Sequence, residues 1–223
     1  MAIPIRVMVE QGKKKTVASA FDWPGWERGG KSEAEALAIL ETYRPRYARV
    51  AKLAGLAKDF SAIGSFKVVE RVAGSGMTDY YTLSFKSATA ERKPMTEAEC
   101  ERKLALLRAS WAYFDDVASG VSAELRKGPR GGGRERDDII RHVNVVEIGD
   151  FALKVGVTSP EDAWKNRAKL RAHRDAFCAA IRDYNSRGAP ARTWTVPCTL
   201  RHSAYHVLDH AWEMEDRDLS GRA

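Results

Sequence analysis

Long apolar runs are absent from this chain, and cysteine is scarce. No uninterrupted apolar segment approaches the ~20 residues that a membrane-spanning helix requires, and the N-terminal residues become polar too early for the core of a signal peptide. The three cysteines in 223 residues are far apart and form no Cys-x-x-Cys pair, which argues against a disulfide framework. We therefore expect a cytoplasmic protein with reduced thiols and no membrane association.

Aromatic residues are also missing from the most basic segments, where a single-strand nucleic-acid interface would need them. The chain carries 37 lysines and arginines against 30 acidic residues, so its net charge is +7. The two densest basic segments, residues 12–15 and 126–136, contain no aromatic side chain on which a base could stack. We therefore expect a small-molecule substrate rather than nucleic acid. A homodimer is compatible with this composition.

The first 92 residues combine strand patterns with one helical segment, which predicts a small α/β domain. Gly12 lies between the first two segments with a strand pattern, which predicts a hairpin there. Ser32 and Glu35 have the spacing of a capping box that begins a helix, and Pro45 interrupts that helix. Three segments are predicted as strands from their β-branched or alternating apolar residues: 5–10, 15–23 and 65–72. Residues 79–85 are predicted as a further strand or, alternatively, as a structured loop.

Helical periodicity dominates residues 93–223, which we predict to be a second domain, a four-helix bundle. Thr96 and Glu99 form another capping box, and Ser159 followed by Pro160 has the pattern of a helix start. The chain as a whole is therefore predicted to be α+β. The four predicted helices begin and end at about 96–127, 136–154, 159–187 and 198–217.

Three of the five histidines lie on the last predicted helix, where four-residue spacing places His202, His206 and His210 on one face. Two neutral imidazoles at this spacing can hold one metal ion, but a third ligand must come from elsewhere. His142 lies on an apolar helix and is expected inside, whereas His173 has basic neighbours and is expected at the surface. The histidine face lies opposite the apolar face of its helix, so a metal site requires another element to cover it.

Acidic residues accompany the histidines. Asp209 and Glu213 share their face and are the candidates for catalytic groups, either orienting the imidazoles or carrying a proton. The alternative is that they form salt bridges with Arg201 or Arg217. Glu147 is five residues after His142, so it points away from that histidine. We expect it to pair with another helix.

Two segments together resemble the DinB/YfiT-like superfamily: "RDDIIRHVNVVEIGDFALKVGV" at 136–157 and "RHSAYHVLDHAWEMEDR" at 201–217. Members are four-helix bundles that hold a metal with one histidine from the second helix and a late H-x-x-x-H pair. The resemblance implies that His142, His206 and His210 are the metal ligands. It also implies a metal-dependent hydrolase or a transferase that uses a low-molecular-weight thiol. We favour zinc or nickel, although three histidines also suit iron and copper.

The segment "VASAFDWPGWERGGKSEAEALAIL" at 17–40 is similar to the HicB antitoxin core, a small α/β fold that masks a partner protein. Two hypotheses follow. In the first, the chain is a metal-dependent enzyme whose basic loop, 126–136, recognises an anionic substrate. In the second, the N-terminal domain is a non-enzymatic binding module and the bundle is structural. The positions that match the HicB pattern are Asp22, Pro24, Gly25, Gly30, Ser32, Glu35 and Ala36.

Overall fold

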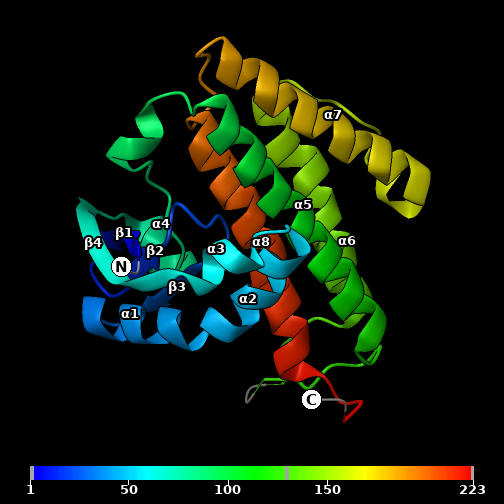
Figure 1. Cartoon of the computed structure of the whole chain (residues 1–223). Coiled ribbons are helices and arrows are strands. Elements are labelled where there is room, and N and C mark those ends of the chain that lie inside the picture. The colour runs from blue at the N-terminus through cyan, green and yellow to red at the C-terminus, as the bar shows by residue number, and fades with distance from the viewer. Residues whose placement is uncertain (1–2, 129–130, 222–223) are drawn as a thin grey trace.

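A four-stranded sheet at the N-terminal end of the chain is followed by a helical part, so the architecture is α+β (Figure 1). The computed structural model describes residues 3–128 and 131–221. The sheet contains β1 (Ile3–Gln11), β2 (Thr16–Ser19), β3 (Glu27–Gly30) and β4 (Ile63–Ala73). Its order is β3-β2-β1-β4, with β1 antiparallel to β2 and parallel to β4. The predicted hairpin is confirmed, because the amide of Gly12 donates to the carbonyl of Lys15 at 2.8 Å.

The strand β3 falls outside the segments that the sequence predicts as strands. Gly29 and Gly30 resemble loop residues, yet they pair with β2 in an antiparallel ladder. Their missing side chains are what the packing requires. A Cβ atom on Gly29 would lie 2.2 Å from Cγ2 of Thr82, and one on Gly30 would lie 2.7 Å from the backbone nitrogen of Ala36. The two glycines therefore let a helix and a loop approach the sheet closely.

Residues 79–85 form no strand, and the alternative of a structured loop holds only for their last residues. The chain forms the short helix α4 (Gly76–Tyr81) there, because Ser75 and Thr78 make a reciprocal capping box. The loop that follows is held by Glu10, a fully buried residue of β1. The carboxylate of Glu10 accepts hydrogen bonds from the Ser84 hydroxyl and from the amides of Phe85 and Lys86.

Three further helices lie between β3 and β4 in the chain: α1 (Glu33–Thr42), α2 (Arg44–Leu53) and α3 (Ala57–Ser61). The predicted cap at Ser32 is confirmed, because its side chain accepts from the amide of Glu35 at 3.2 Å. Pro45 lies in the first turn of α2, which fits the predicted break. Two short 3₁₀ turns lie in loops: η1 (Thr89–Arg92) and η4 (Ala163–Lys165).

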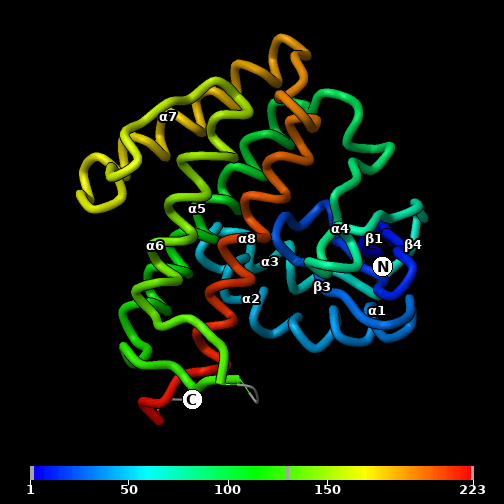
Figure 2. Tube along the Cα trace, turned by 180° about the vertical axis from the view of Figure 1, so that it is seen from behind, coloured from blue at the N-terminus to red at the C-terminus, as the bar shows by residue number. Residues whose placement is uncertain are grey.

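Four long helices form the second part of the chain (Figures 1 and 2). They are α5 (Glu97–Gly120), α6 (Arg136–Val146), α7 (Arg167–Ser186) and α8 (Val196–Arg217). Both views show α5, α6 and α8 side by side, with α7 slanting across one end of this group. Among the described residues, no helix combines the length and the apolar character that crossing a membrane needs.

The bounds of two helices differ from the sequence prediction. Helix α6 ends at Val146. A π turn, η2 (Glu147–Phe151), and a 3₁₀ turn, η3 (Ala152–Val155), follow it directly. Helix α7 begins at Arg167 rather than Ser159, because Asn166 caps it by accepting from the amides of Ala168 and Lys169. Ser159 has a different contact, with the ring of His173.

One apolar core extends through both parts of the chain. It includes Trp26 beside the sheet as well as Leu104 of α5 and Trp212 of α8, each no more than 1 % exposed. A buried ion-pair network joins the same parts. The guanidinium of Arg201 on α8 donates to Glu27 of β3 and to Glu91 of η1, each at 2.8 Å. The sheet therefore fixes the position and rotation of α8.

Candidate metal centre

His142, His206 and His210 converge at the contact between α6 and α8. One ring nitrogen of each lies within 4.8 Å of the others, and the three ring centroids are 4.8 to 5.0 Å apart. His206 and His210 come from successive turns of α8, as their spacing predicts, and His142 faces them from α6. The structure therefore brings together the three residues that the sequence suggests as ligands.

One pair of donor atoms has the spacing that two ligands of a bound ion would have. Nε2 of His206 lies 3.2 Å from Nε2 of His142. Two nitrogen ligands at ~2.1 Å from a tetrahedral zinc ion would lie ~3.3 Å apart. A hydrogen bond between two neutral imidazoles has a similar length, but it would leave the convergence of His210 unexplained. An all-imidazole donor set of this size fits a divalent transition metal.

Glu213 orients the third imidazole. Its carboxylate lies 2.8 Å from Nδ1 of His210, and its other oxygen accepts from Arg217 at 2.8 Å. A carboxylate on Nδ1 holds the proton there and leaves the lone pair on Nε2, which is the form that binds a metal. The hydrogen bond from His210 lowers the pKa of Glu213. The predicted role of Glu213 in orienting an imidazole, and its predicted pairing with Arg217, thus both fit the structure.

Burial keeps two of the imidazoles in the neutral form. Loss of solvent, together with the nearby His210 and Arg134, lowers the pKa of His142 to about 4. The same causes, burial first, lower the pKa of His206 well below its ordinary value. Because a metal binds the neutral imidazole, these ligands need no deprotonation near pH 7.

The cover over the histidine face comes from α6 and from the π turn that follows it. The ring of Phe151 in this turn lies 5.6 Å from the ring of His206. All three histidines remain partly exposed, so the centre is accessible to a ligand from solution. The sequence does not indicate that Phe151 lies near the site, because its place beside His206 depends on the π turn η2.

Asp209 has a different environment from the one predicted for a catalytic group. Its carboxylate accepts from Arg28 of β3 at 2.8 Å. The guanidinium of Arg28 lies between two aromatic rings, 3.8 Å from Tyr43 and 4.3 Å from Trp212. Within residues 3–128 and 131–221, none of the hydrogen bonds joins Asp209 to the triad. Its predicted salt-bridge partner was Arg201 or Arg217, and the observed partner is Arg28.

The other two histidines lie outside the centre. His202 is 4 % exposed and stacks on Trp194, with ring centroids 4.1 Å apart. His173 is 2 % exposed, so its predicted surface position is wrong. On α7 it shares the buried face with Phe177 and Ile181, at four-residue intervals, while its basic neighbours Lys169 and Arg171 are exposed.

Glu147 pairs with another helix, as predicted. Its carboxylate accepts from Nε of Arg174 on α7 at 3.1 Å. The basic loop 126–136 is only partly described, since residues 129–130 lie outside the described residues. Lys127 pairs with Glu135 across the loop, and Arg126 donates to the backbone carbonyl of Asp216. These contacts tie both ends of the loop to neighbouring structure.

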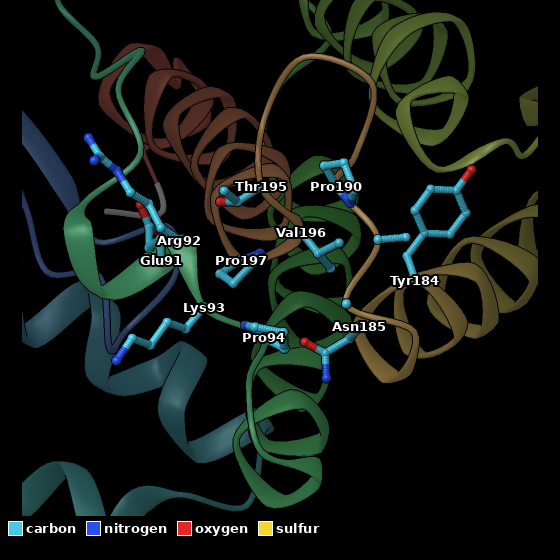
Figure 3. A pocket seen from close by; sticks show the side chains of 12 residues that line it. Glu91, Arg92, Lys93, Pro94, Tyr184, Asn185, Pro190, Thr195, Val196 and Pro197 are labelled. Atoms are coloured by element: carbon cyan, nitrogen blue, oxygen red, sulfur yellow. The ribbon is translucent and has the colours of Figure 1, made fainter.

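A separate pocket opens beside the N-terminus of α8, away from the triad (Figure 3). Its polar groups already have structural partners. Glu91 is paired with Arg201, and the amide of Asn185 both accepts from and donates to the backbone of Met95, at 2.8 and 2.9 Å. The residues of this pocket come from η1, α7, α8 and the loops between them, and they include none of the predicted ligands.

Comparison of the chain with protein-family models, with curated proteins and with solved structures found no match.

Proposed function

We propose that this protein is a metal-dependent enzyme of the DinB/YfiT-like type, in which His142, His206 and His210 hold one divalent ion. The convergence of three imidazoles from two helices, with nitrogens within 4.8 Å of one another, carries the proposal. Zinc or nickel is the ion we favour for an all-nitrogen donor set. The ligand order, one histidine on α6 and an H-x-x-x-H pair on α8, supports the DinB-like assignment of the helical part.

Three protein ligands leave room for a fourth, exchangeable ligand. When bound, the ion would act as a Lewis acid that lowers the pKa of water or of a thiol, which suits hydrolysis or thiol transfer. The chain's own contribution is positional. Glu213 fixes the ring of His210, and Phe151 shields one side of His206. The partial exposure of the triad gives a small substrate access.

The second hypothesis, a HicB-like binding module, has one supporting observation. The N-terminal elements follow the order β-β-β, helices, β, which suits a small α/β unit. The contacts of the N-terminal part with the helices weigh against its acting as an independent binding module. Arg201 of α8 is 2 % exposed and bonds Glu27 of β3, so the N-terminal part cannot separate from α8 without breaking a buried ion pair. We therefore favour the N-terminal part as the support of α8 in an enzyme.

The direct test is metal content. Purified protein, loaded with zinc or nickel and freed of excess by gel filtration, should retain about one ion per chain by elemental analysis. His206→Gln should lose most of it, because a ligand is removed. His202→Gln is the matched control: it makes the same change one turn earlier on α8, outside the triad, and should retain the ion. Both variants need a cooperative thermal transition to be informative.

A wild-type chain that takes up no zinc or nickel, or equal loss in both variants, would refute the metal site. If the ion binds, hydrolysis of ester substrates and transfer of a low-molecular-weight thiol to an electrophile should be assayed with and without it. Activity that needs the ion and disappears in His206→Gln is the expected outcome for an enzyme. Metal binding without activity in either assay would favour a structural ion.

A further inference from the structure

An arginine-rich groove lies between α5 and α7, away from the histidine triad. It encloses a cavity of about 250 Å³. Four arginines line it: Arg108 from α5, and Arg167, Arg171 and Arg174 from α7. Trp111 and Leu170 supply an apolar wall. The two helices cross here, with α7 slanting over α5 (Figure 1).

Most of these arginines have no acidic partner. Within the described part of the chain, no salt bridge or side-chain hydrogen bond involves Arg108, Arg167 or Arg171. Arg174 is only 9 % exposed, and its contacts with Glu147, Asn144 and Asp115 are long, at 3.1, 3.3 and 3.5 Å. A guanidinium has five N–H donors in a fork that suits phosphate and carboxylate oxygens. Arg174 therefore brings to the groove a nearly buried cation whose hydrogen bonds are weak.

The first turns of α7 have the wrong charge for their position. The N-terminus of a helix carries a partial positive charge and favours acidic side chains. Helix α7 has no acidic residue in its first turn, and it begins with Arg167, Lys169 and Arg171. Such a local conflict, with no structural compensation, is typical of a functional site. An anion bound in the groove would remove the conflict.

We propose that this groove binds the phosphate group of a small organic phosphate. The charge of the lining favours a dianion, because two aspartates, Asp115 and Asp175, offset two of the four arginines and leave +2. A phosphate monoester carries about −1.5 to −2 near neutral pH. The wall of Trp111 and Leu170 would contact the organic part of the ligand. This site is independent of the proposed metal centre, and it extends the function to recognition of an anion.

The test uses inorganic phosphate and phenyl phosphate as probes, with benzoate as the monoanionic comparison, in calorimetric titrations of the full chain treated with a chelator. Saturable binding of both phosphates, tighter than benzoate, is expected. The variant Arg167→Gln/Arg171→Gln should raise the Kd for phosphate about tenfold or more, since hydrogen bonds to charged groups contribute on that order each. Lys165→Gln/Lys169→Gln removes the same charge from the same segment outside the groove and should leave the Kd within about twofold.

A second measurement separates binding from stability. Without phosphate, the arginine double variant should melt at or above the temperature of the wild-type chain, because it relieves the charge conflict at the start of α7. Phosphate should raise the melting temperature of the wild type more than that of the variant. No saturable phosphate binding, equal weakening in the lysine control, or a lower melting temperature of the arginine variant would each overturn the proposal. The last result would assign the arginines a purely structural role.

Discussion

One face of α8 carries charged side chains that are paired with the N-terminal part of the chain, whereas another face carries histidines that meet α6. Toward the sheet, Arg201 bonds Glu27 and Asp209 bonds Arg28, each at 2.8 Å. Toward α6, Nε2 of His206 lies 3.2 Å from Nε2 of His142. The difference separates two uses of buried polar groups. Matched charges hold the two parts together, and converging neutral donors are free to bind a ligand.

The largest expected effect on stability comes from removing Arg201, the buried cation on the charged face of α8. Arg201→Leu leaves Glu27 and Glu91 buried without their cation, which should lower the free energy of unfolding by ~3–5 kcal/mol. Denaturant unfolding followed by circular dichroism measures it. Arg182→Leu is the control, because its pair with Glu101 is exposed and should contribute only ~0–1 kcal/mol. Similar losses in both variants would mean that burial of the Arg201 network has no special importance.

The sheet that supports this face depends on close backbone approach. Gly30→Ala adds a Cβ atom 2.7 Å from the backbone nitrogen of Ala36 in α1, so α1 must move. We expect a loss of ~1–3 kcal/mol in unfolding free energy. Gly76→Ala is the matched control, because a Cβ atom there meets nothing within 4 Å. A loss in the control as large as in Gly30→Ala would contradict the steric explanation.

Two carboxylates on α8 differ in their expected influence on the histidines, and substituting each one tests this difference. Glu213→Gln weakens the hydrogen bond that orients His210, and metal affinity should fall ~10–100-fold. Asp209→Asn, which disturbs only the pair with Arg28, should leave metal affinity nearly unchanged. Competition titration with a chromogenic chelator gives both values. An equal effect of the two substitutions would show that Asp209 also acts on the centre.

The smallest expected effect concerns His173, which lies on the buried face of α7. Burial, and then the nearby Arg174, lowers its pKa to about 4, from 6.5 in an unfolded chain. The unfolded state therefore binds a proton between these values when the folded state does not, so acidification from pH 6.5 to 4 lowers stability. His173→Gln should have a shallower loss over this window. Ring titration by NMR should give a midpoint near 4, and a midpoint near 6.5 would contradict the burial argument.

Periodic features of the sequence predict the helical part well. The apolar residues that recur every three or four positions from Leu104 to Val117 are buried along α5. The four-residue spacing of His206 and His210 gives the expected pair of neighbouring rings. The choice of His142 as third ligand followed from its apolar helix and from the family resemblance. The buried face of α5 and the pair of rings on α8 are confirmed, because each depends on spacing within one helix. The assignment of His142 as a metal ligand stays a prediction.

The missed features depend on tertiary contacts. Strand β3 and the position of Gly29 reflect the space needed by Thr82, which is distant in sequence. The burial of His173 reflects the late start of α7 at Asn166 and its contact with Ser159. Asp209 faces Arg28 because the sheet lies against α8, and no local pattern reveals this neighbour.

The most direct test of the metal centre is X-ray absorption spectroscopy of the zinc-loaded protein. The structure predicts three imidazole nitrogens in the first shell at ~2.0–2.1 Å, with the remaining position filled by a light atom from solvent. His202→Gln should leave this spectrum unchanged, and His142→Gln should remove one imidazole from it. A first shell made of sulfur or carboxylate oxygen, or one with fewer than three imidazoles in the wild-type protein, would contradict the account.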